Sequence, residues 1–228
     1  MWKTTVKLSI SFAFLLNTAI IIFLFDEYVY ILDDILIPIL FVYFFIDALS
    51  VIVPKLNKQL FSGKYMIKFF KEYPKYNLQK VKELQQRENK VALGIFFFYF
   101  TGIIGIGLLY LMNDWFELKH LYLVFLFINL SDYICIMLWC PFRDLFMKNK
   151  CCNTCRISNW DRLMKFALLL FIPSFYSISI FMMGLLVFII WEISYTMNPQ
   201  YFFPMSNEAL RCTECDLPCK IRKKEQPK

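Results

Sequence analysis

Cysteines are the residues of this chain with the clearest chemical potential, and most of them fall into two groups in polar regions. Each group contains a Cys-x2-Cys pair, a spacing at which a short turn points two thiolates at one ion. Two such pairs predict a four-cysteine site for zinc or for an iron–sulfur cluster. The predicted ligands are Cys152, Cys155, Cys212 and Cys215, with Cys151 and Cys219 as further candidates.

Other interpretations of these cysteines remain open at the level of sequence. The two pairs are separated by residues 156–211, a much longer gap than the roughly 15–20 residues of a zinc ribbon. Reduced structural thiols are one alternative, and disulfides in an oxidising compartment are another. Cysteines near a membrane edge are also S-acylated in eukaryotic cells, and the residues so placed are Cys140, Cys151 and Cys152.

Two acidic residues, Asp47 and Asp132, lie inside strongly apolar segments. A charged side chain at the centre of a bilayer costs about 2.5–3.5 kcal/mol on insertion scales, so such residues face the interior of a helix bundle. Asn129 and Ser131 accompany Asp132 and predict a small polar patch. One interpretation is an ion or substrate path. The other is structural pairing with polar neighbours in the cytoplasmic third of the membrane.

Long apolar blocks must position these residues. Apolar side chains make up 59% of the chain, and blocks of about 18 or more are long enough to cross a bilayer as helices. The sequence therefore predicts an all-α, polytopic membrane helix bundle in residues 1–193, followed by a polar, cysteine-containing tail at 194–228. Four firm transmembrane helices are expected at about 8–25, 35–53, 91–112 and 121–139, and a fifth apolar segment at 163–193. The first is interpreted as a retained helix and not as a cleaved signal peptide.

The fifth segment is ambiguous because Pro173 interrupts it. Its length of about 46 Å as a helix is long for one crossing and short for two. In one interpretation, residues 163–172 lie along the interface and residues 175–191 cross. In the other, the chain enters the bundle, turns near Pro173 and returns. Only the second places both cysteine groups on one side of the membrane.

Charge predicts the orientation. Residues 55–90 hold ten Lys or Arg against three Glu, so the loop 54–90 is expected to be cytoplasmic, as is the N-terminus. Six basic residues at 143–165 indicate the same side for the first cysteine group. Lysines alternating with aromatic residues predict contact with anionic lipid headgroups, and not with nucleic acid. The second half of the loop, 77–90, is expected to continue into the third span as a helical stalk.

Several functions are disfavoured by what the sequence lacks. His120 is the only histidine, and no Gly-rich nucleotide-binding motif occurs. We therefore expect a protein that is not an enzyme, and we assign no catalytic residue.

Residues 140–219 also carry a resemblance. The stretches CPF, MKNKCCNTCRI and NWD between Cys140 and Asp161, followed by Trp191-Glu192 and the second cysteine pair, resemble a group of small bacterial membrane proteins with no function attached. The resemblance implies a bacterial inner-membrane location and lowers the expectation of S-acylation. It transfers no catalytic residue.

The sequence thus predicts an integral membrane protein with a cytoplasmic-face cysteine metal site in a structural or redox-accessory role. The alternatives are a small transporter or channel subunit that uses Asp47 and Asp132, or a membrane scaffold with an unidentified protein partner.

Overall fold

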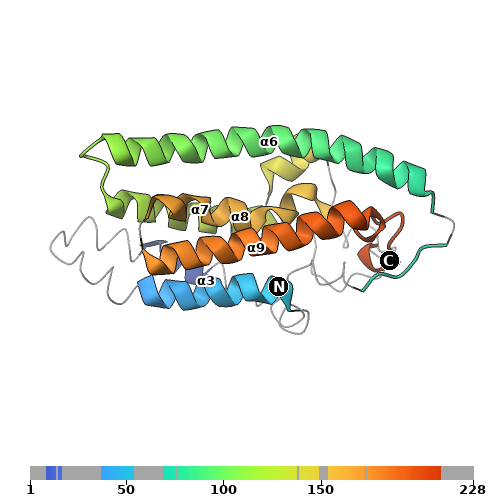
Figure 1. The fold of residues 1–228 in the computed structure, drawn as a ribbon, viewed down its shortest axis with the longest axis horizontal. Helices are drawn as coiled ribbons and strands as arrows, with labels where there is room; N and C mark the ends of the chain where they lie inside the picture. The colour runs from blue at the N-terminus through green and yellow to red at the C-terminus, as the bar shows by residue number, and fades with distance from the viewer. Residues whose placement is uncertain are drawn as a thin grey trace, which may run out of the picture.

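The computed structural model describes residues 9–13, 15–16, 37–53, 69–74, 76–137, 139–148, 154–172 and 174–211. These residues form an all-helical bundle (Figure 1). Three helices are long and apolar enough to cross a membrane: α6 (Leu78–Met112), α7 (Leu118–Met137) and α9 (Phe175–Met197). A shorter apolar helix, α3 (Ile37–Ile52), packs along α9. Their length and composition indicate a multi-pass membrane protein.

Helix α6 runs the length of the bundle (Figure 1). Asn77 caps it, because its side-chain oxygen accepts hydrogen bonds from the backbone N–H groups of Gln79 and Lys80 at 2.8 and 3.4 Å. The helix then continues from polar into apolar sequence without a break, so the predicted stalk at 77–90 is confirmed as its first part. We refer to the two ends of the bundle as the Leu78 end and the Met112 end, after the ends of this helix.

Helix α7 returns from the Met112 end through a short connection, as the sequence predicts for the third and fourth spans. Trp115 in this connection is 67% exposed, and Trp139 just after α7 is 52% exposed. Both therefore present apolar rings at the helix ends, where interfacial anchors lie in membrane proteins.

The first half of the ambiguous apolar run forms α8 (Asp161–Phe166) and the 3₁₀-helix η6 (Ala167–Phe171). Three contacts fix its path along α6. Arg156 Nε donates to Asn89 at 2.9 Å, the Tyr99 hydroxyl donates to the Met164 carbonyl at 2.8 Å, and Phe171 packs on Gly107. From Asn89 to Gly107 α6 advances about 27 Å, close to the thickness of a bilayer core. The run therefore follows α6 through the bundle.

This segment is buried, and it does not lie along an interface. Every side chain from Arg162 to Leu169 is less than 9% exposed, and α8 and η6 contact α6, α7 and α9. Irregular backbone is tolerated at membrane depth only where protein covers it. The packing of the surrounding helices meets that condition for a segment that is part α-helix and part 3₁₀-helix.

After Ile172 the chain reverses, and α9 runs back to the Leu78 end (Figure 1). Gly184 of α9 packs on Phe166, Glu192 bonds to Arg156, and the carbonyl of Tyr195 accepts from Gln85 of α6 at 3.0 Å. Of the two interpretations of residues 163–193, the structure therefore has the one in which the chain enters the bundle and returns. Arg156 and Tyr195 consequently lie at the same end.

Residues 199–211 fold back at the Leu78 end. Tyr73 N–H donates to the Ser206 carbonyl at 3.0 Å, Lys71 forms an ion pair with Glu208 at 2.8 Å, and Phe70 stacks on Tyr201. The start of the tail is thus anchored on the segment just before α6. Most of the predicted first span and of the headgroup-facing part of the loop lies outside the described residues. Residues 69–74 are not helical.

Candidate functional site

Five charged side chains meet inside the bundle, and we call them the charge cluster. Arg162 of α8 lies 3.0 Å from a carboxylate oxygen of Asp47 on α3 and 3.0 Å from one of Asp161. Lys165, one turn further along α8, lies 2.7 Å from Asp132 on α7. Longer contacts of 3.9 and 4.0 Å connect Arg162 to Asp132 and Lys165 to Asp47. The two predicted intramembrane acids are thus brought together by a pair of cations.

Three of the six basic residues at 143–165 are buried in the structure. Arg156, Arg162 and Lys165 were among the six basic residues that indicated a cytoplasmic loop, yet their side chains are only 1–8% exposed. They neutralise buried acids instead of facing headgroups. The side of the membrane that the charges of residues 143–165 and 55–90 indicate stays a prediction.

The cluster lies in the last third of α3 and of α7. Asp47 and Asp132 each precede the last residue of their helix by five positions, about 8 Å. The predicted patch of Asn129, Ser131 and Asp132 is not a unit: Asn129 donates to Ser11 at 3.0 Å, and Ser131 donates to the Phe127 carbonyl at 2.8 Å.

Two tyrosines lie beside the cluster, Tyr43 one turn before Asp47 on α3 and Tyr133 next to Asp132 on α7. The hydroxyls of Tyr43 and Tyr133 are 2.7 Å apart, and the Lys165 ammonium lies 5.0 Å from the centre of the Tyr133 ring. Apolar rings pack close by, with Phe44 and Phe125 in edge-to-face contact.

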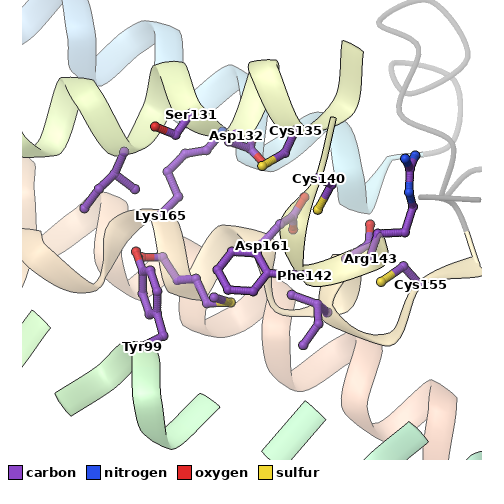
Figure 2. Close-up of a pocket in the computed structure, with 14 residues that line it drawn as sticks. Tyr99, Ser131, Asp132, Cys135, Cys140, Phe142, Arg143, Cys155, Asp161 and Lys165 are labelled. Carbon is purple, nitrogen blue, oxygen red and sulfur yellow. Dashed lines mark hydrogen bonds and ion pairs between the residues drawn. The ribbon is translucent and has the colours of Figure 1, made fainter. Parts of the chain in front are cut away.

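A cavity of about 320 Å³ opens beside the cluster (Figure 2). Its volume falls in the range typical of small-molecule sites. Asp132, Asp161 and Lys165 of the charge cluster contribute to its wall. The remaining wall is largely apolar, apart from Ser131, Ser158, Arg143 and the Tyr99 side chain, and includes three cysteines. The cysteines are Cys135, Cys140 and Cys155.

One of these thiols, Cys140, has a lowered pKa. It follows α7 and precedes the short π-helix η3 (Phe142–Met147). A hydrogen bond from Cys135 lowers the pKa of Cys140 from 9.0 to about 6, helped by backbone N–H groups of Arg143 and Phe142, whereas burial opposes the shift. Figure 2 shows both sulfurs on the same wall of the cavity. The sequence gives no signal for the pair Cys135 and Cys140, because a spacing of five residues matches no motif.

A second ionic contact joins the Leu78 end of the crossing segment to α9. Both guanidinium nitrogens NH1 and NH2 of Arg156 donate to the Glu192 carboxylate at 2.6 Å, and Trp160 Nε1 donates to it at 2.6 Å. The Arg156 guanidinium also lies 4.1 Å from the centre of the Tyr195 ring. Glu192 therefore accepts the hydrogen bonds that hold Arg156, the residue after Cys155, in place.

Of the predicted metal ligands, Cys155 alone lies in the described part of the chain. It is buried and packs with Ala92, Ile95 and Trp160. The remaining candidates, Cys151, Cys152, Cys212, Cys215 and Cys219, lie outside the described residues. Among the residues that are described, no group of three or more His, Cys, Asp or Glu is arranged to hold a metal ion.

The spacing of Arg162 and Lys165 was the signal that sequence reasoning missed. Positions three apart lie on one face of a helix, and the two cations are followed by an apolar run. Two buried acids elsewhere in the chain require partners, and these cations are the ones that the fold supplies.

Comparison of the chain with protein-family models, with curated proteins and with solved structures finds no match.

Proposed function

We propose that the protein is a small membrane transporter or channel subunit that binds a proton or a small cation at the charge cluster. The observation that carries the proposal is that two acids of the cluster, Asp132 and Asp161, line a cavity. Acids within a membrane bundle commonly mark ion or substrate paths. Arg162 and Lys165 hold these two carboxylates in place at 3.0 and 2.7 Å, and the cavity gives a small ion access to them.

The cavity supports access to this site. Asp132 and Asp161 line it, and their side chains retain 21% and 20% exposure, whereas Asp47 retains 3%. An ion that enters from the Leu78 end therefore meets the acids of α7 and α8 first. The hydroxyls of Tyr43 and Tyr133 lie beside the cluster and add further polar groups to the path.

Proton flux into liposomes tests this proposal. Reconstituted protein is given a pH gradient under a potassium diffusion potential, and internal pH is followed with a trapped dye. Asp132→Asn and Asp47→Asn are each expected to lower the protein-dependent flux at least tenfold. Asp144→Asn is the matched control, because this acid pairs with Arg143 outside the cluster at 2.6 Å.

Wild-type flux equal to that of empty liposomes, for protons and for sodium and potassium in parallel, would contradict the proposal. Unchanged flux in both cluster variants would do the same. Monodispersity of each variant in detergent separates a loss of flux from a loss of fold.

A second candidate function, the cysteine metal site, is favoured by the reversal of the chain after Ile172. Cys155 packs at the level of Ala92 on α6, and the start of the tail bonds to Lys71 and Tyr73, just before that helix begins at Leu78. Ala92 and Leu78 are about 21 Å apart along the helix. Residues 152–155 and 212–215 extend up to about 13 Å each, so the two pairs are within reach of one ion. A plain crossing would have kept them apart.

Metal analysis tests this second candidate. Anaerobically purified protein with iron and visible absorption would identify a cluster, and colourless protein with about one zinc per chain a structural site. The variant Cys212→Ser/Cys215→Ser is expected to lose the metal. Purified protein that holds neither metal would remove the candidate.

The setting of both candidates is also part of the proposal. The resemblance of residues 140–219 to small bacterial membrane proteins supports an inner membrane, and the basic content of residues 55–90 supports a cytoplasmic Leu78 end with lysines on anionic headgroups.

A further inference from the structure

We propose that Cys135 and Cys140 form a redox-active dithiol that exchanges with a small disulfide entering the cavity. Both thiols line the cavity wall, where Figure 2 shows their sulfurs near each other. They come from the last turn of α7 and from the turn that follows it, so the bundle and η3 hold them from either side. The inference does not depend on ion transport through the charge cluster.

The positions of the two sulfurs suit a disulfide. A disulfide requires sulfurs about 2.05 Å apart, and two thiols on one cavity wall can reach that distance by a change of side-chain rotamer. Trp139 N–H bonds to the Ile134 carbonyl at 3.3 Å, which folds the chain tightly between the two cysteines. The third cavity cysteine, Cys155, belongs to a separate apolar cluster with Ala92 and Trp160.

Cys140 is the nucleophile and Cys135 the resolving residue. The Cys140 thiolate accepts the Cys135 hydrogen bond, backbone N–H groups of Phe142 and Arg143 lie beside it, and the Arg143 guanidinium adds positive charge. A thiolate is the attacking species in thiol–disulfide exchange. Cys135 keeps its proton until the second step.

The steps balance as follows. The Cys140 thiolate attacks one sulfur of the incoming disulfide R–S–S–R, forms Cys140–S–S–R and releases R–S⁻. Cys135 loses its proton to that leaving thiolate and attacks the Cys140 sulfur, releasing a second R–S⁻, which takes up the proton lost from Cys140. The protein is oxidised by two electrons, the small disulfide is reduced to two thiols, and the reverse sequence restores the dithiol.

The cavity limits the class of disulfide. Its volume of about 320 Å³ and its mostly apolar wall admit a low-molecular-weight disulfide but not a folded protein. Arg143 and Lys165 share this wall with Asp132 and Asp161, so it suits a disulfide whose substituents carry both an amino group and a carboxylate, such as cystine.

The test uses full-length protein in detergent micelles at pH 7. The protein is incubated with cystine, quenched with acid and mapped by peptide mass spectrometry. We expect an intramolecular Cys135–Cys140 disulfide to appear before any other modification. Cys135→Ala is expected to stop at a mixed disulfide on Cys140, at least tenfold faster than on Cys155, and Cys140→Ala to abolish the reaction of Cys135.

Cys155→Ala is the matched control, and we expect it to leave the Cys135–Cys140 disulfide unchanged. A disulfide between Cys140 and Cys155, or thiols at 135 and 140 that persist while other cysteines are oxidised, would overturn the proposal. If Cys135→Ala is not monodisperse, Cys135→Ser provides the same reading with a smaller change in polarity.

Discussion

At the scale of single residues, this protein pairs buried charges that are far apart in its sequence. Asp47 and Asp132 are separated by 85 positions, and each is met by a cation of α8. Buried ion pairs add little net stability compared with apolar residues, but removal of one partner leaves an uncompensated charge. Substitution of one residue of a pair is therefore expected to be costly as long as its charged partner remains.

Lys165→Met tests this reasoning. The Lys165 side chain is 1% exposed, and its loss leaves Asp132 with only the longer contact to Arg162. We expect a loss of about 3–5 kcal/mol in unfolding free energy, measured by chemical denaturation in detergent. Lys71→Met is the matched control, because the Lys71–Glu208 pair has a similar distance of 2.8 Å but a 66% exposed lysine; its cost should be below about 1 kcal/mol. Equal losses in the two variants would contradict the buried pairing.

The Cys140 thiol gives a second test at this scale. Since its pKa is lowered to about 6, its thiolate fraction rises through pH 6 and is nearly complete above about pH 7, whereas an ordinary cysteine ionises near pH 8.5. The rate of alkylation by iodoacetamide at Cys140 should follow that curve. Cys135→Ala removes the largest contribution to the shift and should move the midpoint upward. A midpoint near pH 8.5 in the unaltered protein would exclude an acidified thiol.

At the scale of elements, the crossing segment α8–η6 is held by close packing. Of Gly102, Gly105 and Gly107 on α6, only Gly107 is in close contact, where an added Cβ would meet the Phe171 ring. Gly102 and Gly105 have nothing within 4 Å of such an atom. Gly184 on α9 is the counterpart, since its added Cβ would lie 2.7 Å from Phe166 and 3.0 Å from the Arg162 carbonyl oxygen.

Alanine substitutions of these glycines are therefore expected to fall into two groups by their effect on the unfolding free energy. Gly107→Ala and Gly184→Ala should lower the unfolding free energy by about 1–3 kcal/mol through overpacking. Gly102→Ala and Gly105→Ala should be neutral or slightly stabilising, because alanine is the better helix former. Thermal unfolding in detergent measures all four, and a loss at Gly105 equal to that at Gly107 would argue against the described packing.

At the scale of the whole molecule, the return of α9 to the Leu78 end decides which segments of the chain lie together. Arg156–Glu192, Gln85–Tyr195 and Tyr73–Ser206 join the first cysteine group, the helical stalk and the start of the tail at one end. A single helical crossing of residues 163–193 would place the tail at the other end.

Labelling of single cysteines in intact cells tests this arrangement. On a cysteine-free background, cysteines introduced at Gln79 and at Glu208 should show the same accessibility to a membrane-impermeant maleimide. A cysteine at Asp114, in the connection at the Met112 end, should show the opposite accessibility. Opposite labelling of positions 79 and 208 would contradict the reversal after Ile172.

The sequence by itself determined the class of molecule. Apolar blocks longer than 18 residues can hide their backbone polar groups only as helices in a membrane or a core, and α6, α7 and α9 match three predicted segments in type. It also marked Asp47 and Asp132, because charged residues in such blocks require partners. These are local properties of composition and spacing.

Tertiary structure alone decided the partners and the path. Pro173 marks a break, but whether the chain turns back there depends on whether neighbouring helices can cover an irregular crossing, and Gly107, Gly184 and Tyr99 on other helices provide that cover. Arg162 and Lys165 read as loop charges until the same packing buries them against the two acids. Burial and pairing are properties of contacts distant in the chain, which residue spacing does not encode.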